Sequence, residues 1–406
     1  MLTSGLGVMY WILAARVYSP AEVGMNAAII SSLTFLAGIA QLNLRPVLSR
    51  FLPVSGRSSG RFLQVAYAAA VGAAILFSTA YLGGSTIWAD QGVIPMIREN
   101  LLLALGFIAT TALWTVFSLQ DGALIGLRTP VVMVLENVGF GVAKIAVVLV
   151  LASVSAARAL AITISWIGPM IVAVIGVSFA IRRFLLPAHV RAHPELAGIK
   201  IGQGLRFVAG DYVGSLFALS YVALLPAIVV NQVGAAEAAQ FYVAWVIISA
   251  LQIIPPQMVV SLVVDTARDP STFRHQGRRM LIGMLRVIGP LAIGLVLSAN
   301  ILLGVFGSAY EPAAPVLRLL ALSTIPYSVN ILYLGAARVF VAPARIIVVQ
   351  AATAAVILGL SWALVPRLGI AGVGWAFLAG HASISVVLLS TALRFMLRRG
   401  PETDPS

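Results

Sequence analysis

The chain has 406 residues, of which 60% are hydrophobic and only 10% are charged. Soluble proteins carry about 25% charged residues, so a chain this long and this apolar is expected to be a polytopic membrane protein. Its 26 basic residues outnumber its 13 acidic ones, but they lie in short connections between apolar segments and form no basic domain, which argues against a nucleic-acid partner. The absence of cysteine excludes disulfides, thiol chemistry and cysteine-ligated metals.

Twelve apolar segments are long enough, or nearly long enough, to cross a bilayer as helices, which takes about 20 residues. The first is short and opens directly at Met1 with no basic lead, so we expect a first helix that lacks part of its start rather than a cleaved signal peptide. The segments run roughly over residues 2–17, 23–44, 62–83, 101–119, 132–152, 158–181, 205–230, 241–264, 280–306, 317–334, 346–365 and 371–393.

The connection between the first two segments has the composition of a tight reversal. Pro20 disfavours helical backbone at Ser19, so the first helix is expected to end there. Ser19 is a good N-cap, and Glu22 follows three residues later as its capping-box partner. We therefore predict two antiparallel membrane helices joined by a short elbow.

Basic residues are distributed unevenly over the connections. Because basic residues favour the cytoplasmic side, this asymmetry places both termini in the cytoplasm, and it holds for twelve segments but not for eleven or thirteen. The even-numbered connections and the tail hold Arg45, Arg50, Arg57, Arg61, Arg128, Arg182, Arg183, Arg191, Lys200, Arg206, Arg268, Arg274, Arg278, Arg279, Arg338, Arg345, Arg394, Arg398 and Arg399, whereas the odd-numbered ones hold only Arg16, Arg98, Arg158, Arg318 and Arg367.

Two short patterns recur roughly 215 residues apart, which favours an internal duplication. The first is an acid followed by an isoleucine pair, at Glu22 and again at Glu237, and the second is Gly-Ala ahead of a proline, at Gly122 and again at Gly335. With six segments in each half, both halves insert in the same orientation. We expect an all-α fold of two six-helix bundles, at 1–181 and 205–393, with a cytoplasmic linker at 182–204 and a cytoplasmic tail at 394–406.

The stretch from Tyr18 to Gly24, between one apolar helix and a second that ends near Arg45, resembles the opening of polysaccharide-biosynthesis membrane proteins. These are the Wzx-type oligosaccharide flippases of the multidrug/oligosaccharidyl-lipid/polysaccharide (MOP) exporter superfamily. Residues 306–320 and 369–376 resemble the same family's entries into its tenth and last helices. The resemblance implies a cytoplasmic-membrane transporter that flips a prenyl-diphosphate-linked saccharide for surface polysaccharide or lipopolysaccharide, driven by an ion gradient, beside a glycan-polymerisation machinery and membrane lipids.

Four basic residues are candidates for binding an anionic substrate. Lys144 lies near the middle of the fifth segment, too deep to reach water easily, where it would suit a lipid diphosphate unless a neighbouring helix satisfies it. The resemblance implies that Arg45, at the end of the second segment, faces the cavity. Arg206 and Arg286 lie near the cytoplasmic ends of the seventh and ninth segments.

Three further residues are candidates for ion coupling or for a gate. Glu136 and Asp211 share the depth of Arg286, so these charges would pair across the halves or simply reach the nearby interface. His381 lies in the middle of the last segment and titrates near neutral pH unless a hydrogen bond in the bundle holds it.

Several functions are disfavoured by missing motifs. There is no GxxxxGK[ST] loop for ATP, no HExxH zinc motif and no outer connection long enough for a catalytic domain, so we expect no enzyme, cofactor or metal site. Two alternatives to a flippase remain: an ion-coupled multidrug or metabolite antiporter of the same superfamily, and a non-transporting membrane partner of a glycan-synthesis enzyme.

Overall fold

The computed structural model describes residues 2–87, 93–153, 159–192, 205–266, 273–340 and 342–398, which are almost entirely helical and contain no strand. Eleven helices in these ranges are long and apolar enough to cross a membrane, and the shorter apolar helix Gly5–Val17 makes a twelfth apolar helix. Many large hydrophobic side chains on these helices point outward, as expected of a lipid-facing surface. The predicted all-α polytopic fold is confirmed.

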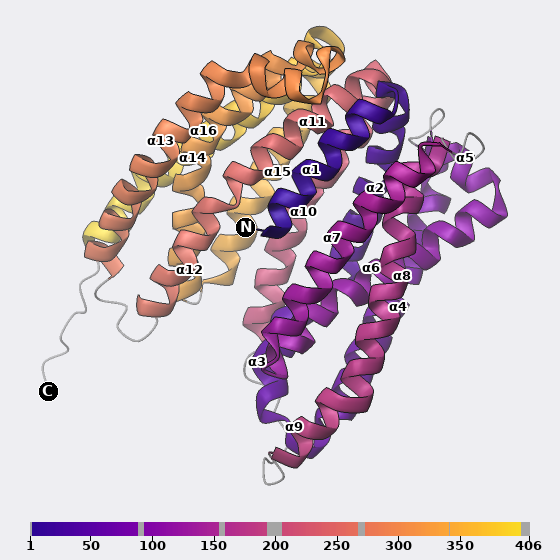
Figure 1. Cartoon of the computed structure of the whole chain (residues 1–406). Helices are drawn as coiled ribbons and strands as arrows, with labels where there is room; N and C mark the ends of the chain where they lie inside the picture. Colours follow the sequence, from indigo (N-terminus) through magenta and orange to yellow (C-terminus); the bar gives the residue numbers. More distant parts are fainter. Residues whose placement is uncertain are drawn as a thin grey trace, which may run out of the picture. The chain divides into compact units, whose positions relative to one another are not determined.

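The chain forms two compact units (Figure 1). Unit 1 comprises residues 1–208 and 234–239, and unit 2 comprises 209–233 and 240–406. In unit 1, α6 is central and packs against α2, α3, α4 and α8, while α7 packs against α1 and α8. Its elements are α1 (Leu2–Val17), α2 (Pro20–Ala40), α3 (Leu44–Phe51), η1 (Leu52–Val54), η2 (Gly56–Ser58), α4 (Ser59–Gly84), η3 (Ser85–Ile87), α5 (Val93–Glu99), α6 (Leu101–Gly126), α7 (Pro130–Leu151), α8 (Ala161–Ala180), η5 (Ile181–Leu185) and α9 (Leu186–Ala192).

Unit 2 is organised around α14, which packs against α12, α13, α15 and α16. Buried apolar side chains of α14, α15 and α16 form one core, and those of α12, α13 and α14 form another. Its elements are α10 (Leu205–Val233), α11 (Ala235–Gln252), α12 (Ile254–Thr266), α13 (Phe273–Phe306), η8 (Ser308–Ala313), α14 (Ala314–Val339), α15 (Pro343–Leu368) and α16 (Ala371–Arg398). The first residues of α10 and α11 belong to unit 1.

The elbow between α1 and α2 has the predicted capping box. The Glu22 backbone N–H donates to Ser19 Oγ at 3.3 Å, and the Ser19 backbone N–H donates to Glu22 Oε2 at 2.8 Å. Pro20 occupies the first position of α2, where its missing N–H costs nothing. The local sequence alone therefore sets this reversal.

The predicted extent of the second segment is wrong at its end. Helix α2 stops at Ala40, and Leu42 and Asn43 adopt left-handed backbone, with φ of 50° and 55°. The chain then turns into the separate helix α3, which lies against the end of α6. Arg45 is consequently a residue of α3, not the last residue of a membrane-crossing helix.

Gly122 on α6 allows the backbone of α3 to approach α6 closely. A Cβ at Gly122 would lie 2.5 Å from the Arg45 carbonyl oxygen and 3.0 Å from its Cα. Unit 2 repeats the arrangement, because a Cβ at Gly335 on α14 would overlap Val259 of α12. These are the two glycines of the repeated Gly-Ala-proline pattern, so the duplication seen in the sequence corresponds to equivalent helix contacts in the two units.

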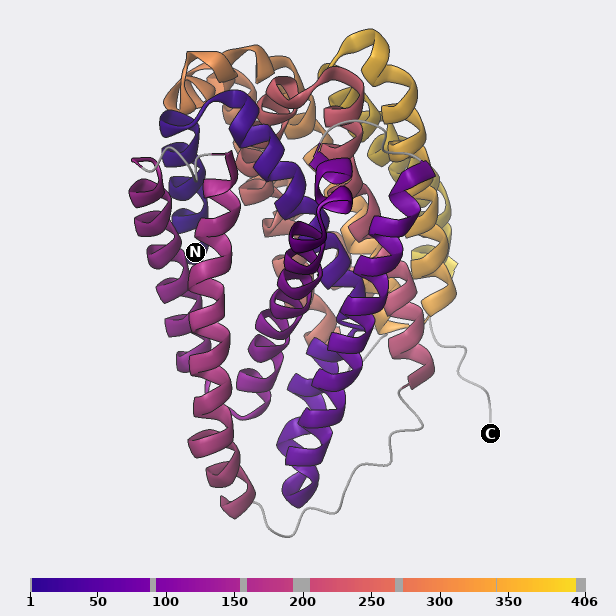
Figure 2. The ribbon, with the colours of Figure 1, turned by 90° about the vertical axis from the view of Figure 1, so that its right-hand side faces the viewer.

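The predicted linker begins as helix. Helix α8 continues through the π-helical turn η5 into α9, so residues 181–192 extend the sixth segment instead of leaving it (Figure 2). Residues 193–204, the remainder of the expected linker, lie outside the described ranges.

Candidate functional site

Lys144 is buried inside unit 1 among aromatic rings. Its side chain is 7% exposed, and its Nζ lies 4.5 Å from the ring centroid of Trp166, 4.7 Å from that of Tyr10 and 5.1 Å from that of Phe140. We call these three rings the lysine cage. The rings come from α8, α1 and α7, so three helices meet at the ammonium.

The cage is itself held in place. The Tyr10 hydroxyl lies 2.8 Å from Ser165 Oγ and donates to the Ile162 carbonyl at 3.1 Å, which fixes α1 against α8. Trp114 on α6 lies behind the cage, with ring centroids 5.0 Å from Trp166. Such packing positions the rings before any ligand arrives.

Lys144 donates no hydrogen bond to a described residue and forms no ion pair with one. A cation over an aromatic face gains about 0.5–2 kcal/mol, which compensates part of its burial without neutralising its charge. Rings of two neighbouring helices therefore surround the ammonium without supplying a counter-charge. Because the partners are rings and not carboxylates, the positive charge stays uncompensated.

Glu136 lies eight residues earlier on the same helix, and its carboxylate has no partner in the described part of the chain. It is 7% exposed, and neither Oε1 nor Oε2 accepts a hydrogen bond from a described residue. The side chain lines a groove of about 620 Å³ between α7 and α8, whose other walls are apolar. An isolated buried carboxylate is costly unless a proton or a cation neutralises it, so this position is suited to binding one.

Arg45 forms a salt bridge with an acidic side chain. Its guanidinium lies 3.0 Å from Asp121 Oδ2, and Asn137 Nδ2 donates to Asp121 Oδ1 at 3.0 Å. Arg45 is half exposed in this pair, with 48% of its side chain accessible, while Asp121 is largely buried. The cluster ties α3 to α6 and α7 at one end of unit 1.

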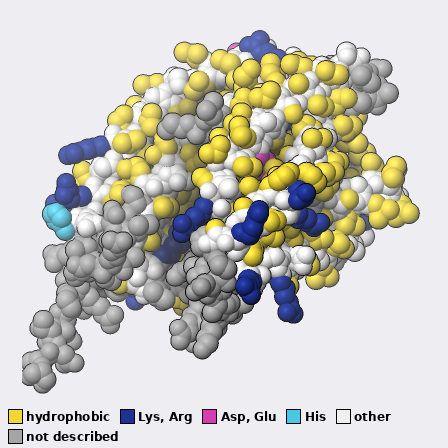
Figure 3. Space-filling view, turned by 60° about the horizontal axis from the view of Figure 1, so that its bottom comes forward, with side chains coloured by type: hydrophobic (Ala, Val, Ile, Leu, Met, Phe, Trp, Pro, Cys, Tyr) yellow, Lys and Arg dark blue, Asp and Glu magenta, His cyan; other side chains and the backbone are white. Residues whose placement is uncertain are grey.

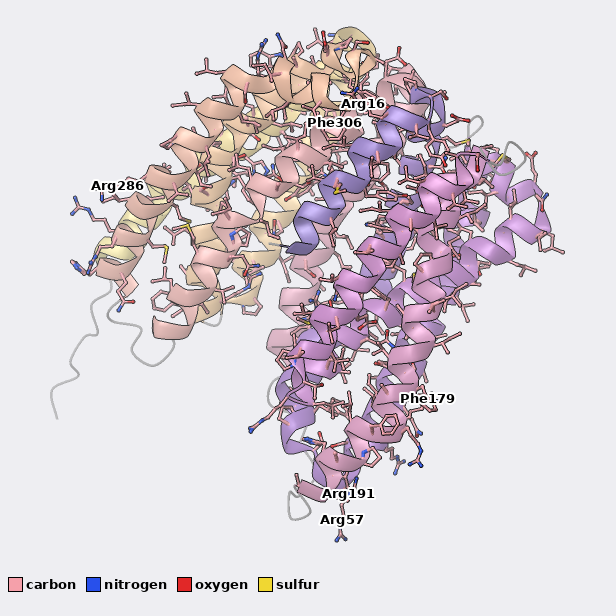
Figure 4. The ribbon with its side chains drawn as sticks, viewed as in Figure 1. Arg16, Arg57, Phe179, Arg191, Arg286 and Phe306 are labelled. Atoms are coloured by element: carbon pink, nitrogen blue, oxygen red, sulfur yellow. The ribbon has the colours of Figure 1, made fainter. Side chains whose placement is uncertain are left out.

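The other predicted residues are not brought to this site by any described contact. Arg206 and Asp211 lie on α10, but their side chains are outside the described part, so the proposed pairing of Asp211 with Arg286 stays a prediction. Arg286 is exposed and points away from the body of α13 (Figure 4).

His381 is buried in unit 2, with 2% of its surface exposed. Asn330 Nδ2 donates to its backbone carbonyl at 3.2 Å and lies 3.3 Å from its Nδ1. The rings of Tyr327 and Phe377 pack around it, at 5.2 and 5.5 Å between centroids. The expected hydrogen bond within the bundle is present, and the second ring nitrogen, Nε2, is buried without a partner among the described residues.

Sequence analysis missed the residues that surround the predicted charges. Asp121 lies two residues beyond the expected end of the fourth segment, because α6 continues to Gly126. Nothing in the sequence distinguishes the cage residues Tyr10, Phe140 and Trp166 from ordinary apolar positions. The one available signal is the four-residue spacing of Glu136, Phe140 and Lys144, which places these residues on one face of a helix. Among the described residues, no group of three His, Cys, Asp or Glu side chains is close enough to hold a metal ion.

Comparison with known proteins rests on structure alone, since no protein-family model and no curated protein sequence matches the chain. The inward-facing conformation of a multidrug resistance MATE family transporter of the MOP superfamily superposes with a TM-score of 0.67 at 12% identity, covering 98% of this chain and 95% of that chain. The chain has the MOP-superfamily transporter fold. The lipid II flippase MurJ, in an inward closed conformation, superposes with a TM-score of 0.70 at 12% identity, over 97% of this chain and 87% of that chain.

A third MOP-superfamily transporter, from Pyrococcus furiosus, is described as having a binding pocket of reverse polarity. It superposes with a TM-score of 0.60 at 12% identity, covering 98% of this chain and 94% of that chain. Proteins with the MOP fold thus include a multidrug transporter, a lipid II flippase and a transporter of altered pocket polarity. The fold therefore does not identify the substrate, which has to be inferred from the side chains of the site.

Proposed function

We propose that the chain flips a lipid-linked saccharide bearing a diphosphate across the cytoplasmic membrane by alternating access, in support of surface polysaccharide biosynthesis. Its MOP fold supports the transport part of this proposal. In it, the bundles predicted at 1–181 and 205–393 are the moving bodies, both termini face the cytoplasm, and glycan-assembly machinery supplies the substrate and takes it up.

The observation that carries the choice of substrate is the uncompensated charge of Lys144. The residue lies roughly 21 Å from the first residue of α7 and roughly 10 Å from its last, at 1.5 Å per residue, well inside the hydrocarbon. A charge at that depth costs about 2.5–3.5 kcal/mol to insert, so a basic residue kept there without an acid is a candidate anion site.

A diphosphate competes well with the lysine cage. Charge-assisted hydrogen bonds to phosphate oxygens are roughly twice as strong as neutral ones, and a flexible four-carbon stem lets the ammonium leave the rings for the ligand. The aromatic faces of Tyr10, Trp166 and Phe140 then remain as an apolar wall beside the substrate.

Glu136 is the coupling group in this proposal. Its orphaned carboxylate takes up a proton or a small cation, and the occupancy of that site is linked to the conformation of the transporter. The same carboxylate favours the second candidate function, an ion-coupled antiporter of cationic drugs or metabolites, because a cationic substrate would find its counter-charge there.

Cells that lack the chain separate these functions. We expect a prenyl-diphosphate saccharide to accumulate and surface polysaccharide to be lost, with the mass of the lipid identifying the glycan. An unchanged lipid pool with altered sensitivity to cationic drugs would favour the antiporter instead. If neither changes, both transport functions are refuted.

Variants of Lys144 then test the site in the same cells. Lys144→Met retains the length of the side chain but lacks the charge, and we expect it to abolish complementation, whereas Lys144→Arg retains at least partial activity. Arg367→Gln, which removes an exposed positive charge from the last turn of α15, is the matched control and is expected to complement fully. Full activity of Lys144→Met at normal protein levels would refute the proposed substrate site.

A further inference from the structure

One end of unit 1 carries several exposed arginines. All of its arginines are exposed, and the elements that form it, η1, η2, α4, α8, η5 and α9, contain no Asp or Glu. Figure 4 places Arg57 and Arg191 at this end and Arg16 at the opposite end, and Figure 3 shows Lys and Arg side chains beside a largely hydrophobic surface. The arginines are Arg57, Arg61, Arg182, Arg183 and Arg191. We call this the basic end.

A pocket of about 400 Å³ opens between α4 and the junction of α8 with η5, at the basic end. Its polar lining residues are Gln64, Tyr67, Ser178 and Arg182, and its apolar ones include Val71. This volume falls in the range of small-ligand sites and is large enough for a glycerophosphate group. The pocket thus joins an apolar wall to a cationic rim.

Two groups in this pocket lack partners. The Tyr67 hydroxyl is buried and makes no hydrogen bond with a described residue, although Glu136 and, more weakly, Arg182 lie near enough to influence it electrostatically. Arg182 makes no ion pair among the described residues. A buried O–H donor and a guanidinium that share one pocket form a pair suited to a phosphate, which accepts from both.

The turn that carries Arg182 is an interruption of the helix. Residues Ile181–Leu185 form a π-helical turn, a feature that appears frequently at functional sites. It exposes Phe179 and Phe184, which pack edge-to-face at 5.9 Å, and Arg183 lies over the Phe184 ring at 5.9 Å. Exposed aromatic rings beside arginines are typical of a membrane–water boundary, so the pocket opens at the level of lipid headgroups.

We propose that this pocket binds the headgroup of an anionic phospholipid, whose phosphate pairs with Arg182 and accepts a hydrogen bond from the Tyr67 hydroxyl. The acyl chains lie along the exposed apolar faces of α4 and α8, where Val65 and Phe179 are accessible. The occupant is a lipid, not a soluble phosphate, because these exposed apolar residues are sequence neighbours of the lining residues Gln64 and Ser178. The positive-inside rule places the basic end in the cytoplasmic leaflet, where anionic lipids reside.

Lipid binding to the purified full-length chain in detergent tests the site without reference to transport. Phosphatidylglycerol is titrated and counted by native mass spectrometry, with phosphatidylcholine as the neutral lipid. One arginine near a membrane surface is worth a factor of about five in affinity, so Arg182→Gln should weaken phosphatidylglycerol binding by about fivefold or more. Tyr67→Phe keeps the ring and removes only the unpartnered hydroxyl, and should weaken binding by about threefold or more.

Arg191→Gln is the matched control, since it removes the same charge from the same end without touching the pocket. It should change the affinity by less than about twofold, because Arg191 does not line the pocket and salt screens its charge at a distance. Equal losses in Arg182→Gln and Arg191→Gln would refute the pocket and leave only a diffuse surface charge. Equal binding of phosphatidylcholine, or displacement of the lipid by millimolar inorganic phosphate, would refute the anionic-lipid assignment. Because the readout is lipid binding, its failure is distinct from failure of the flippase proposal.

Discussion

The contact between α3 and α6 gives a sharp test of the structure, through Gly122→Ala. The added Cβ would meet the carbonyl oxygen of Arg45 at 2.5 Å and its Cα at 3.0 Å. Both are backbone atoms, which cannot rotate aside as a side chain does. Helix α3 must therefore move away from α6, and it carries Arg45 with it, away from Asp121.

The magnitude follows from overpacking. Adding a methyl group to a tightly packed contact typically costs about 1–3 kcal/mol. Loosening the Arg45–Asp121 pair adds less than about 1 kcal/mol, since Arg45 is half exposed and the attraction is screened. The total cost is then about 1–4 kcal/mol. In domains of 150–250 residues, 1 kcal/mol shifts the melting temperature by about 2–4 °C, so Gly122→Ala should melt about 2–16 °C below the wild type.

Thermal unfolding in detergent measures the shift, and two other glycines calibrate it. Gly106→Ala, on the same helix, places a Cβ where nothing lies within 4 Å and should leave the melting temperature unchanged or slightly raised. Gly335→Ala, the equivalent position in unit 2, meets only a side-chain atom of Val259, which can rotate, and should give an intermediate loss. If Gly122→Ala and Gly106→Ala have the same melting temperature, the close approach of α3 to α6 is wrong.

Three further outcomes are expected in the same assay. Ser19→Ala removes the cap that pairs with Glu22 and should cost about 1 kcal/mol, whereas Ser19→Asp, another good N-cap, should retain most of the stability. Asn26→Ala should cost about 2–3 kcal/mol, because its buried amide accepts from both the backbone N–H and the hydroxyl of Thr163; a loss no larger than that of Ser19→Ala would contradict this bridge between α2 and α8. Lys144→Met should leave stability unchanged or raise it, because the lost cation–π contacts offset only part of the relieved insertion cost, and a large loss would mean that the lysine is structural.

Features set by neighbouring residues were predictable from the sequence. The capping box needs only Ser19, Pro20 and Glu22, and it forms as expected. The membrane helices follow from apolar length, and the repeated glycines mark equivalent contacts in the two units. Each of these depends on information carried within a short window or on a comparison of the chain with itself.

The surroundings of the charges were not predictable, because they depend on packing between distant segments. Tyr10 reaches Lys144 across 134 positions, and no local pattern pairs the two. The predicted end of the second segment was wrong for a different reason. Apolar composition continues through Leu42 and Leu44, whereas in the folded chain a left-handed turn at Leu42 and Asn43 leads into α3, which packs against Gly122.

The charges of Glu136 and Lys144 set the sign of the coupling between an anionic substrate and the coupling ion, and their separation sets its size. The two lie eight residues apart on α7, roughly 12 Å along the axis, so they do not form a direct pair. At that distance and an effective dielectric constant of about 20, one unit of charge is worth about 1.4 kcal/mol, a factor of about ten in affinity. A negative Glu136 repels an anion held by Lys144, and neutralising it removes that repulsion.

Proton or cation uptake at Glu136 should therefore strengthen binding of a diphosphate at Lys144, and by reciprocity the diphosphate should strengthen uptake at Glu136. Glu136→Gln, which mimics the neutral state, is expected to tighten binding of farnesyl diphosphate to the purified chain by about tenfold, and the gain should vanish in the Lys144→Met background. A gain that persists without Lys144 would place the anion elsewhere. Weaker binding in Glu136→Gln would refute the repulsion and with it this sign of the coupling.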